Sequence, residues 1–189
     1  CAGARVAAAG AGWPLGPPRP VLARQLEPLG PVVVFAASNF PFAFSVAGGD
    51  TAAALAAGCT AVLKAHSGHP QLSQRTGELV VEALEAVGAP DGLFAVIFGT
   101  ESGRTALLDP RVKAGSFTGS IPGGRALFDL ASSRPEPIPF YGELGSTNPV
   151  FVTENAEAAR AVAIAEQFLD SMTMGAGQSC TKPGVLFAP

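Results

Sequence analysis

The sequence predicts an α/β protein built on a Rossmann-like, doubly wound parallel sheet, followed by the start of a second domain. Three observations support this fold class. Short β-branched runs alternate with stretches of helical spacing along most of the chain. The connections are short and rich in the 23 glycines and 17 prolines. Strands and helices that alternate in this way form a parallel sheet with helices on both faces.

The first predicted strand is residues 31–36, Pro-Val-Val-Val-Phe-Ala, a β-branched run typical of a buried strand. A turn at 38–41 follows it. Residues 44–57 have the helical spacing of small apolar side chains, and Gly58 is well placed to end that helix. Residues 61–64, Ala-Val-Leu-Lys, form the second predicted strand.

The clearest predicted helix is 72–87, because its apolar residues share one face and its glutamates lie outside it. After the turn at 90–92 come a third strand at 93–98, a short helix at 103–108 and a fourth strand at 114–118. The apolar face of the 72–87 helix is expected to comprise Leu72, Leu79, Val80, Ala83, Leu84 and Val87.

The remaining elements follow the same alternation of strand and helix. In order, they are a helix at 124–132, a fifth strand at 138–144, a strand at 149–152, a helix at 156–172 and a last strand at 185–187. The first 30 residues are rich in Ala, Gly, Pro and Arg and are predicted to be an irregular arm.

Composition excludes several classes of function. The hydrophobic fraction of 48% is ample for a packed core. A net charge of −3 and no basic stripe argue against a nucleic-acid partner. No apolar stretch reaches the roughly 20 unbroken residues that a membrane span needs.

The cysteines and histidines of the chain bear on compartment and metal binding. Cys1, Cys59 and Cys180 are sparse and form no CxxC pair, which favours a reducing, cytoplasmic compartment and argues against a zinc–thiolate site. His66 and His69 have no further ligand nearby, so we expect no metal.

Polar residues follow four of the predicted strands. They are Ser38-Asn39, Lys64, Gly119-Ser120 and Glu143. Sheets of this kind bind ligands at the carboxyl ends of their strands, so these residues are candidates for one site. Each also has an ordinary explanation, respectively as a turn former, a surface charge, a plain helix start and a turn cap.

The stretch Gly175-Ala-Gly-Gln-Ser-Cys-Thr181 brings a cysteine behind a glycine-rich approach. A thiol becomes a nucleophile where its surroundings favour the thiolate, and glycines let the backbone approach a ligand closely. Alternatively, Cys180 is a small buried hydrophobe in a loop.

No GxGxxG fingerprint follows the first strand, so a nucleotide would be held by another device. Gly119-Ser120 opens a predicted helix, whose free N–H groups and dipole suit a pyrophosphate. Lys64 is placed to reach a ribose or a phosphate.

Together these motifs resemble the aldehyde dehydrogenase superfamily. Their order and spacing agree with it from about residue 19 to 189. The matching stretches are Ser38-Asn39-Phe-Pro, Val-Leu-Lys64, Gly119-Ser120-xxx-Gly124, Glu143-Leu-Gly-Ser and Gly177-Gln178-x-Cys180. The loop sequences resemble those of one branch, the 2,5-dioxovalerate (α-ketoglutarate semialdehyde) dehydrogenases and the NADP-preferring fatty aldehyde dehydrogenase.

This resemblance implies an NAD(P)-dependent oxidation of an aldehyde to a carboxylic acid, with 2,5-dioxopentanoate as one candidate substrate. Cys180 is then the nucleophile, Asn39 an oxyanion donor and Glu143 the base for deacylation. The cofactor would contact Ser38, Lys64, Ser67 and the Gly119–Gly124 helix start. NAD-preferring relatives carry a glutamate where this chain has Ser67, so NADP is the expected cofactor, with NAD the alternative.

The resemblance also implies a division of the chain. Residues 31–146 correspond to the NAD(P)-binding domain and 147–189 to the beginning of a catalytic domain, after the arm at 1–30. Members of the superfamily are much longer, and full-length members are expected to be homo-oligomers. We therefore expect a fragment that is weakly active or inactive alone.

Two other readings remain open. The chain is alternatively a nucleotide-binding fragment or pseudoenzyme without turnover. The CoA-acylating or phosphorylating branch shares the cysteine, but its members tend to lack the deacylating glutamate, so Glu143 weighs against it.

Overall fold

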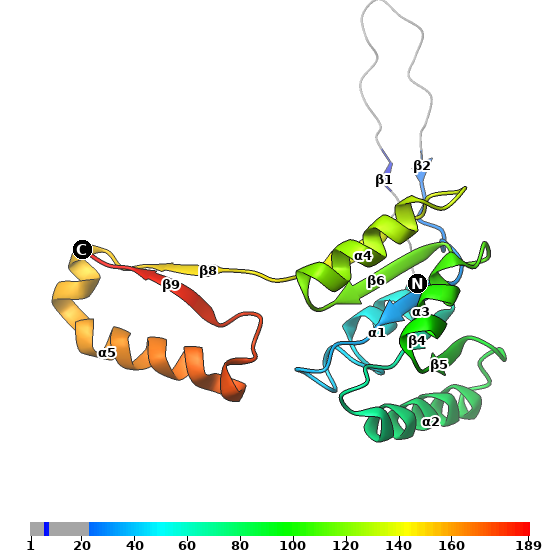
Figure 1. The fold of residues 1–189 in the computed structure, drawn as a ribbon, viewed down its shortest axis with the longest axis horizontal. Helices are drawn as coiled ribbons and strands as arrows, with labels where there is room; N and C mark the ends of the chain where they lie inside the picture. The colour runs from blue at the N-terminus through cyan, green and yellow to red at the C-terminus, as the bar shows by residue number, and fades with distance from the viewer. Residues whose placement is uncertain (1–5, 8–22) are drawn as a thin grey trace, which may run out of the picture.

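The centre of the molecule is a five-stranded parallel sheet (Figure 1). It is seen in a computed structural model that describes residues 6–7 and 23–189. The strand order is β5–β4–β3–β6–β7. The strands are β3 (Val32–Phe35), β4 (Ala61–Lys64), β5 (Phe94–Ile97), β6 (Ala114–Thr118) and β7 (Phe140–Glu143). The fold class predicted from the sequence is confirmed.

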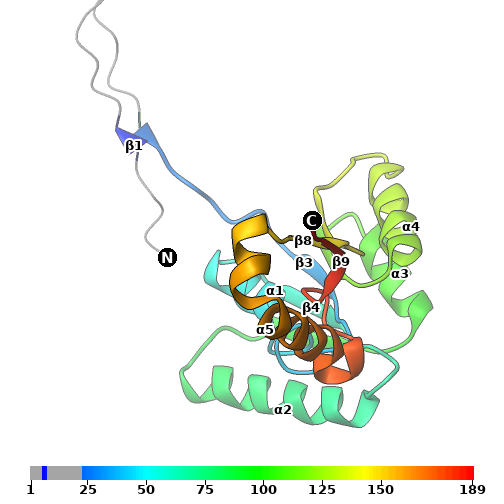
Figure 2. The same ribbon diagram turned by 90° about the vertical axis from the view of Figure 1, so that its left-hand side faces the viewer.

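Helices cover both faces of this sheet (Figure 2). α1 (Gly49–Ala56) and α2 (Pro70–Ala86) pack on one face, and α3 (Thr100–Leu108) and α4 (Ile121–Ser132) on the other. The central strand β3 serves both cores. Its Val32 and Val34 belong to the first core, and its Val33 and Phe35 to the second. A strand buried on both faces must be apolar throughout, which explains its unbroken hydrophobic run.

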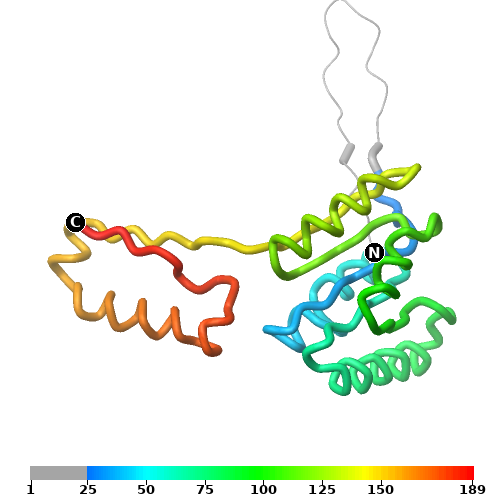
Figure 3. Tube along the Cα trace, in the orientation of Figure 1, coloured from blue at the N-terminus to red at the C-terminus, as the bar shows by residue number. Residues whose placement is uncertain are grey.

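Residues 148–189 form a smaller unit beyond the sheet (Figure 3). β8 (Asn148–Phe151) and β9 (Pro183–Phe187) are parallel and are connected through α5 (Glu154–Thr173) and the single 3₁₀ turn η1 (Met174–Gly177). α5 bends at Arg160, whose φ and ψ of −157° and 35° are not helical. The rings of Phe151 and Phe187 stack with their centroids 5.0 Å apart.

Two short strands lie in the predicted arm. β1 (Val6–Ala7) and β2 (Ala23–Arg24) pair antiparallel, a pairing that the sequence did not predict. The remainder of the predicted arm up to residue 22 lies outside the described residues. None of the described helices combines the length and the apolar character needed to cross a bilayer.

One predicted helix begins later than expected. The expected helix over 44–57 starts only at Gly49, because residues 40–49 fold into successive turns. Backbone bonds such as Phe44 N–H to the carbonyl of Phe40 and Gly49 N–H to the carbonyl of Ala43, both 3.0 Å, hold these turns.

The buried face of α2 also differs from the prediction. Leu79 and Val87 are exposed, whereas Ser73 and Gly77 are buried, with Val80 and Leu84 partly buried beside them. A Cβ on Gly77 would lie 2.6 Å from the Cγ2 of Val96 on β5. The glycine therefore lets the helix approach the sheet closely, and this selects the face that is buried.

Candidate functional site

A cavity of about 670 Å³ lies at the carboxyl edge of the sheet, and the loop after η1 also lines it. Most of the residues predicted from the sequence as one site line this cavity. They are Ser38, Asn39, Lys64, Gly119, Ser120, Glu143 and Cys180. Ser67 and Gly124 are not in its lining.

The strand register explains why these residues meet. Phe35 at the end of β3 is level with Lys64 on β4 and with Phe117 on β6. Thr118 on β6 is level with Glu143 on β7. Because all four strands run parallel, the residues that follow them emerge at the same edge.

The cysteine loop enters the cavity through an unusual backbone. Gly175, Ala176 and Gly177 have φ of 59°, 57° and 70°, three consecutive residues in the left-handed region. Glycine adopts that region freely, whereas Ala176 does so at a cost in strain. Cys180 follows in a half-buried position, next to Ser179, which is only 5% exposed.

Three side chains hold the cysteine loop through its carbonyl oxygens. The Asn39 Nδ2 donates to the Gln178 carbonyl at 2.9 Å. The Ser146 Oγ donates to the Cys180 carbonyl at 2.9 Å, and the Asn148 Nδ2 donates to the same carbonyl at 2.8 Å. Asn148 was not singled out from the sequence. Its only signal there is an Asn-Pro pair at the start of a strand, which is an ordinary turn feature.

At the start of α4, fewer backbone amides are free than the sequence predicted. Gly119 N–H donates to the Glu143 carbonyl at 3.0 Å, and Gly123 N–H donates to the Ser120 Oγ, which caps the helix, at 3.3 Å. Pro122 has no N–H. Within the described part of the chain, the amides of Ser120 and Ile121 are thus left for an anion.

Small residues keep this helix start open. A Cβ on Gly119 would lie 2.7 Å from Cζ of Phe117, and one on Gly123 would lie 3.1 Å from the Ser120 Oγ. Gly124 is buried behind the cavity, where an added Cβ would collide with the side chain of Leu144. The open backbone and its amides fit a pyrophosphate group, and Gly124 supports the wall from behind.

The charges of the cofactor side come from β4 and the loop after it. Burial lowers the pKa of the Lys64 ammonium below its usual value. The pKa of His66 is also lowered, chiefly by burial and further by the charges of Lys64 and His69. His66 is therefore neutral at pH 7, and Lys64 is the cation of this wall. Ser67, three residues after Lys64, is exposed.

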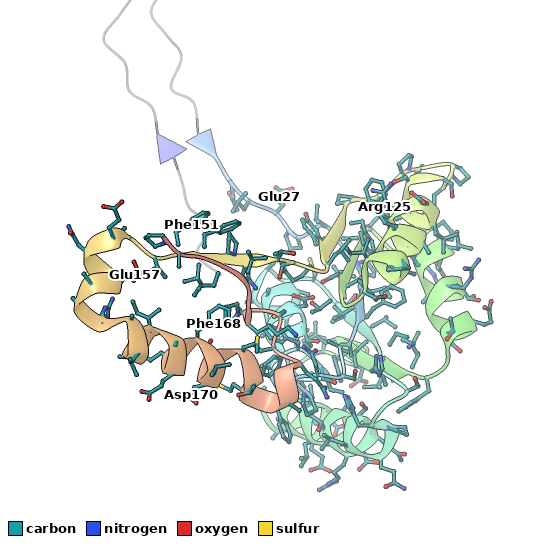
Figure 4. All side chains as sticks on the ribbon, turned by 60° about the vertical axis from the view of Figure 1, so that its left-hand side comes forward. Glu27, Arg125, Phe151, Glu157, Phe168 and Asp170 are labelled. Carbon is teal, nitrogen blue, oxygen red and sulfur yellow. The ribbon has the colours of Figure 1, made fainter. Side chains whose placement is uncertain are left out.

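A second cavity lies outside this site. It has a volume of about 370 Å³ and lies between α5 and the β8–β9 pair, and none of the predicted site residues lines it. In Figure 4, Phe168 lies on the side of α5 that faces this pair, whereas Asp170 points away from it. Across residues 6–7 and 23–189, no three His, Cys, Asp or Glu side chains group together as a metal site would require.

Comparison with protein families and sequences places the chain among known proteins. The model of the aldehyde dehydrogenase family matches residues 5–189. An α-ketoglutaric semialdehyde dehydrogenase of Acinetobacter baylyi is 51% identical over 173 residues, which are 89% of this chain and 32% of that protein. The α-ketoglutaric semialdehyde dehydrogenase 2 of Azospirillum brasilense is 50% identical, over 90% of this chain and 33% of that protein. The chain thus spans about a third of these relatives.

Solved structures resemble the chain in fold. An aldehyde dehydrogenase of Mycobacterium tuberculosis complexed with NAD+ matches with a TM-score of 0.73 and 28% identity, over 98% of this chain and 35% of that chain. A structure described as an E. coli NADP-dependent enzyme matches with a TM-score of 0.70 and 33% identity, over 85% of this chain and 31% of that chain.

Proposed function

The chain belongs to the aldehyde dehydrogenase family, and from this we propose that it provides the cofactor site and the nucleophile for oxidation of an aldehyde to a carboxylic acid. One observation carries the proposal. A thiol (Cys180), an amide donor (Asn39) and a carboxylate (Glu143) line a single cavity beside the open helix start at Ser120. Nucleophile, oxyanion donor and base are the groups that this reaction needs.

We propose the following roles in the first half of the reaction. The Cys180 thiolate attacks the aldehyde carbon and forms a thiohemiacetal. One hydrogen of the Asn39 amide is donated to Gln178, and the other is left for the oxyanion, together with the backbone N–H of Cys180. The amides of Ser120 and Ile121 and the Lys64 ammonium would hold NAD(P), which would supply the hydride acceptor for conversion of the thiohemiacetal to a Cys180 thioester.

Glu143 acts in the second half. Its carboxylate takes a proton from the water that attacks the thioester carbon. The bond to sulfur breaks, the carboxylic acid leaves and the Cys180 thiol is regenerated. The bond from Gly119 N–H to the Glu143 carbonyl ties this residue to the end of β6 beside the helix start.

The cofactor is proposed to be NADP in preference to NAD. Ser120 and Ile121 would offer amides to the pyrophosphate, and Lys64 would offer its charge to the ribose and phosphate end. No carboxylate stands at Ser67 to repel a 2′-phosphate. Binding constants of the chain for the two cofactors test this preference, and strong rejection of NADP would overturn it.

The proposed substrate is 2,5-dioxopentanoate, which yields 2-oxoglutarate. This choice is supported by the two relatives at 51% and 50% identity, whose names specify this semialdehyde. A cytoplasmic location is proposed from the sparse cysteines, and a homo-oligomeric whole enzyme from membership of the family. The described pair, Cys59 and Cys180, are free thiols.

A nucleotide-binding module without turnover is the second candidate. The observation that favours it is that the chain spans only about a third of these two relatives. We therefore expect the 189-residue chain alone to turn over weakly or not at all.

A chimera tests the proposed reaction independently of that shortness. The chain would replace the matching third of the Acinetobacter baylyi relative, and NADPH formation from 2,5-dioxopentanoate would be followed. We expect turnover that Cys180→Ala abolishes. Glu143→Gln should give one rapid equivalent of NADPH and then a slow phase, because deacylation loses its base.

The controls separate the two candidates. Cys59→Ala removes the other described thiol and should leave the rate unchanged. A folded chimera that binds NADP but forms no NADPH would favour the binding module. Steady turnover by the Cys180→Ala chimera would reject the cysteine mechanism.

A further inference from the structure

We infer that Ser146 and Asn148 form a clamp that positions the Cys180 loop against the segment that carries Glu143. The Asn148 Nδ2 donates to the carbonyls of Cys180 and Lys182 at 2.8 and 2.9 Å. The Ser146 Oγ donates to the Cys180 carbonyl at 2.9 Å. This clamp is a positioning device, and its catalytic part rests on the function proposed above.

The clamp acts on the peptide that follows the nucleophile. A carbonyl oxygen has two lone pairs, and here each meets one side-chain donor. Both donors together fix the plane of the Cys180–Thr181 peptide. Because the cysteine side chain has a single heavy-atom torsion, the backbone at Cys180 determines the positions that its sulfur can reach.

The loop has little regular structure of its own to fix it. Residues 178–182 belong to neither a helix nor a strand, and they follow three left-handed residues that include the strained Ala176. Asn39 holds the loop at Gln178 from the side of the sheet. The clamp holds the loop at Cys180 and Lys182 through the segment that follows β7.

The position of the clamp in the sequence links base and nucleophile. Ser146 and Asn148 lie three and five residues after Glu143, which ends β7. Asn148 begins β8, where it pairs with Pro183 at an irregular point of the ladder. The segment 143–148 therefore carries the proposed base at one end and grips the nucleophile's backbone at the other.

Hydrogen exchange in the 189-residue chain tests the clamp without any assumption about activity. Asn148→Asp keeps the shape but loses the donor and sets a carboxylate against two carbonyls. We expect amides of 174–182 to exchange at least about tenfold faster, with the central strands unchanged. Ser146→Ala should also speed the exchange of these amides. Ser146→Thr, which keeps the hydroxyl, should leave their protection close to that of the unchanged chain.

Matched controls make the same chemical changes elsewhere. Asn155→Asp alters an exposed asparagine near the start of α5, and Ser133→Ala removes a hydroxyl that donates to the Leu130 carbonyl at 3.1 Å. Neither should change exchange in 174–182. Unchanged exchange in both Asn148→Asp and Ser146→Ala would overturn the clamp.

The positioning role is tested in the chimera. We expect Asn148→Asp and Ser146→Ala to lower kcat by about 10- to 100-fold with little change in the KM for NADP, because misplacing a nucleophile affects the chemical step. Faster exchange with an unchanged kcat would reject positioning while keeping the structural clamp. An inactive parent chimera would count against the proposed function, whereas the exchange results would still decide the clamp.

Discussion

Gly124, in the first turn of α4, lies directly against Leu144, the residue that follows Glu143. The site wall at Glu143 is therefore supported by a contact that leaves no room for a methyl group. Ala176 is the opposite case, because it keeps a side chain in a backbone region where glycine is favoured. The absent side chain of Gly124 lies beside the segment of the proposed base, and the methyl group of Ala176 lies in the loop of the proposed nucleophile.

Gly124→Ala tests the contact at this scale. The added methyl should displace Leu144 and lower the free energy of unfolding by about 1–3 kcal/mol, as overpacking does. Urea denaturation measures this change. Leu144→Ala in the same chain should recover part of the loss by making space. Gly49→Ala, where nothing lies within 4 Å of the added Cβ, is the control. Equal effects at Gly49 and Gly124 would contradict the contact argument.

At the scale of elements, Arg134 joins α3 to the end of α4. It is 6% exposed and donates to the carbonyls of Leu107, Asp109 and Val112 at 2.9, 3.0 and 3.1 Å. Two of these carbonyls lie at or just after the C-terminus of α3, where the helix dipole favours a positive charge. The buried guanidinium is thus satisfied by backbone oxygens.

Arg134→Lys should destabilise the fold by about 2–3 kcal/mol. A single ammonium cannot reproduce the spread of a guanidinium over three acceptors, so buried carbonyls lose their partners. The midpoint of urea unfolding reports the loss. Arg125→Lys is the matched control on α4, where the exposed side chain pairs with Asp129 at 3.5 Å. That change should cost less than about 0.5 kcal/mol, and a similar cost at both positions would argue against the link.

Elements differ in how far the sequence predicts them. The strand β4 was predicted with its observed bounds, because its apolar run Ala-Val-Leu is local information. The buried face of α2 was not, because Gly77 lies against Val96, a residue in another element. Likewise, the parallel strands predicted that Asn39, Lys64 and Glu143 would line one site. The hydrogen bond from Gly119 N–H to the Glu143 carbonyl was not predicted, because it joins two elements and has no signal in the periodicity of the sequence.

Across the whole molecule, the five-stranded sheet and residues 148–189 are buried to different degrees. Val33 and Leu63 in the sheet are fully buried, whereas the 20 residues of α5 include none that is buried. Several apolar residues within 148–189 are exposed, among them Phe151 at 72% and Val162 at 73%. The cysteine loop therefore joins a well-packed part to a sparsely packed one.

Exchange across the whole chain should reveal this difference. Amides in α5 should exchange at least about a hundredfold faster than those of β3 and β4, because few buried contacts oppose local opening. Mass spectrometry of the 189-residue chain measures both. α2 is the internal control, since it is also long but buries Ser73 and Gly77, and it should lie between them. Equal protection of α5 and the central strands would contradict this reasoning.

The contacts that hold the cysteine loop also set an order of assembly. The loop is closed by hydrogen bonds between residues 139, 34 and 32 positions apart in the chain. Contacts of such separation form late, because the chain between them must be ordered first. On the ribosome, the sheet edge that presents Asn39 is therefore made long before Cys180 is synthesised. The thiol site is accordingly assembled only after residues 178–182 have been synthesised and can reach the sheet edge.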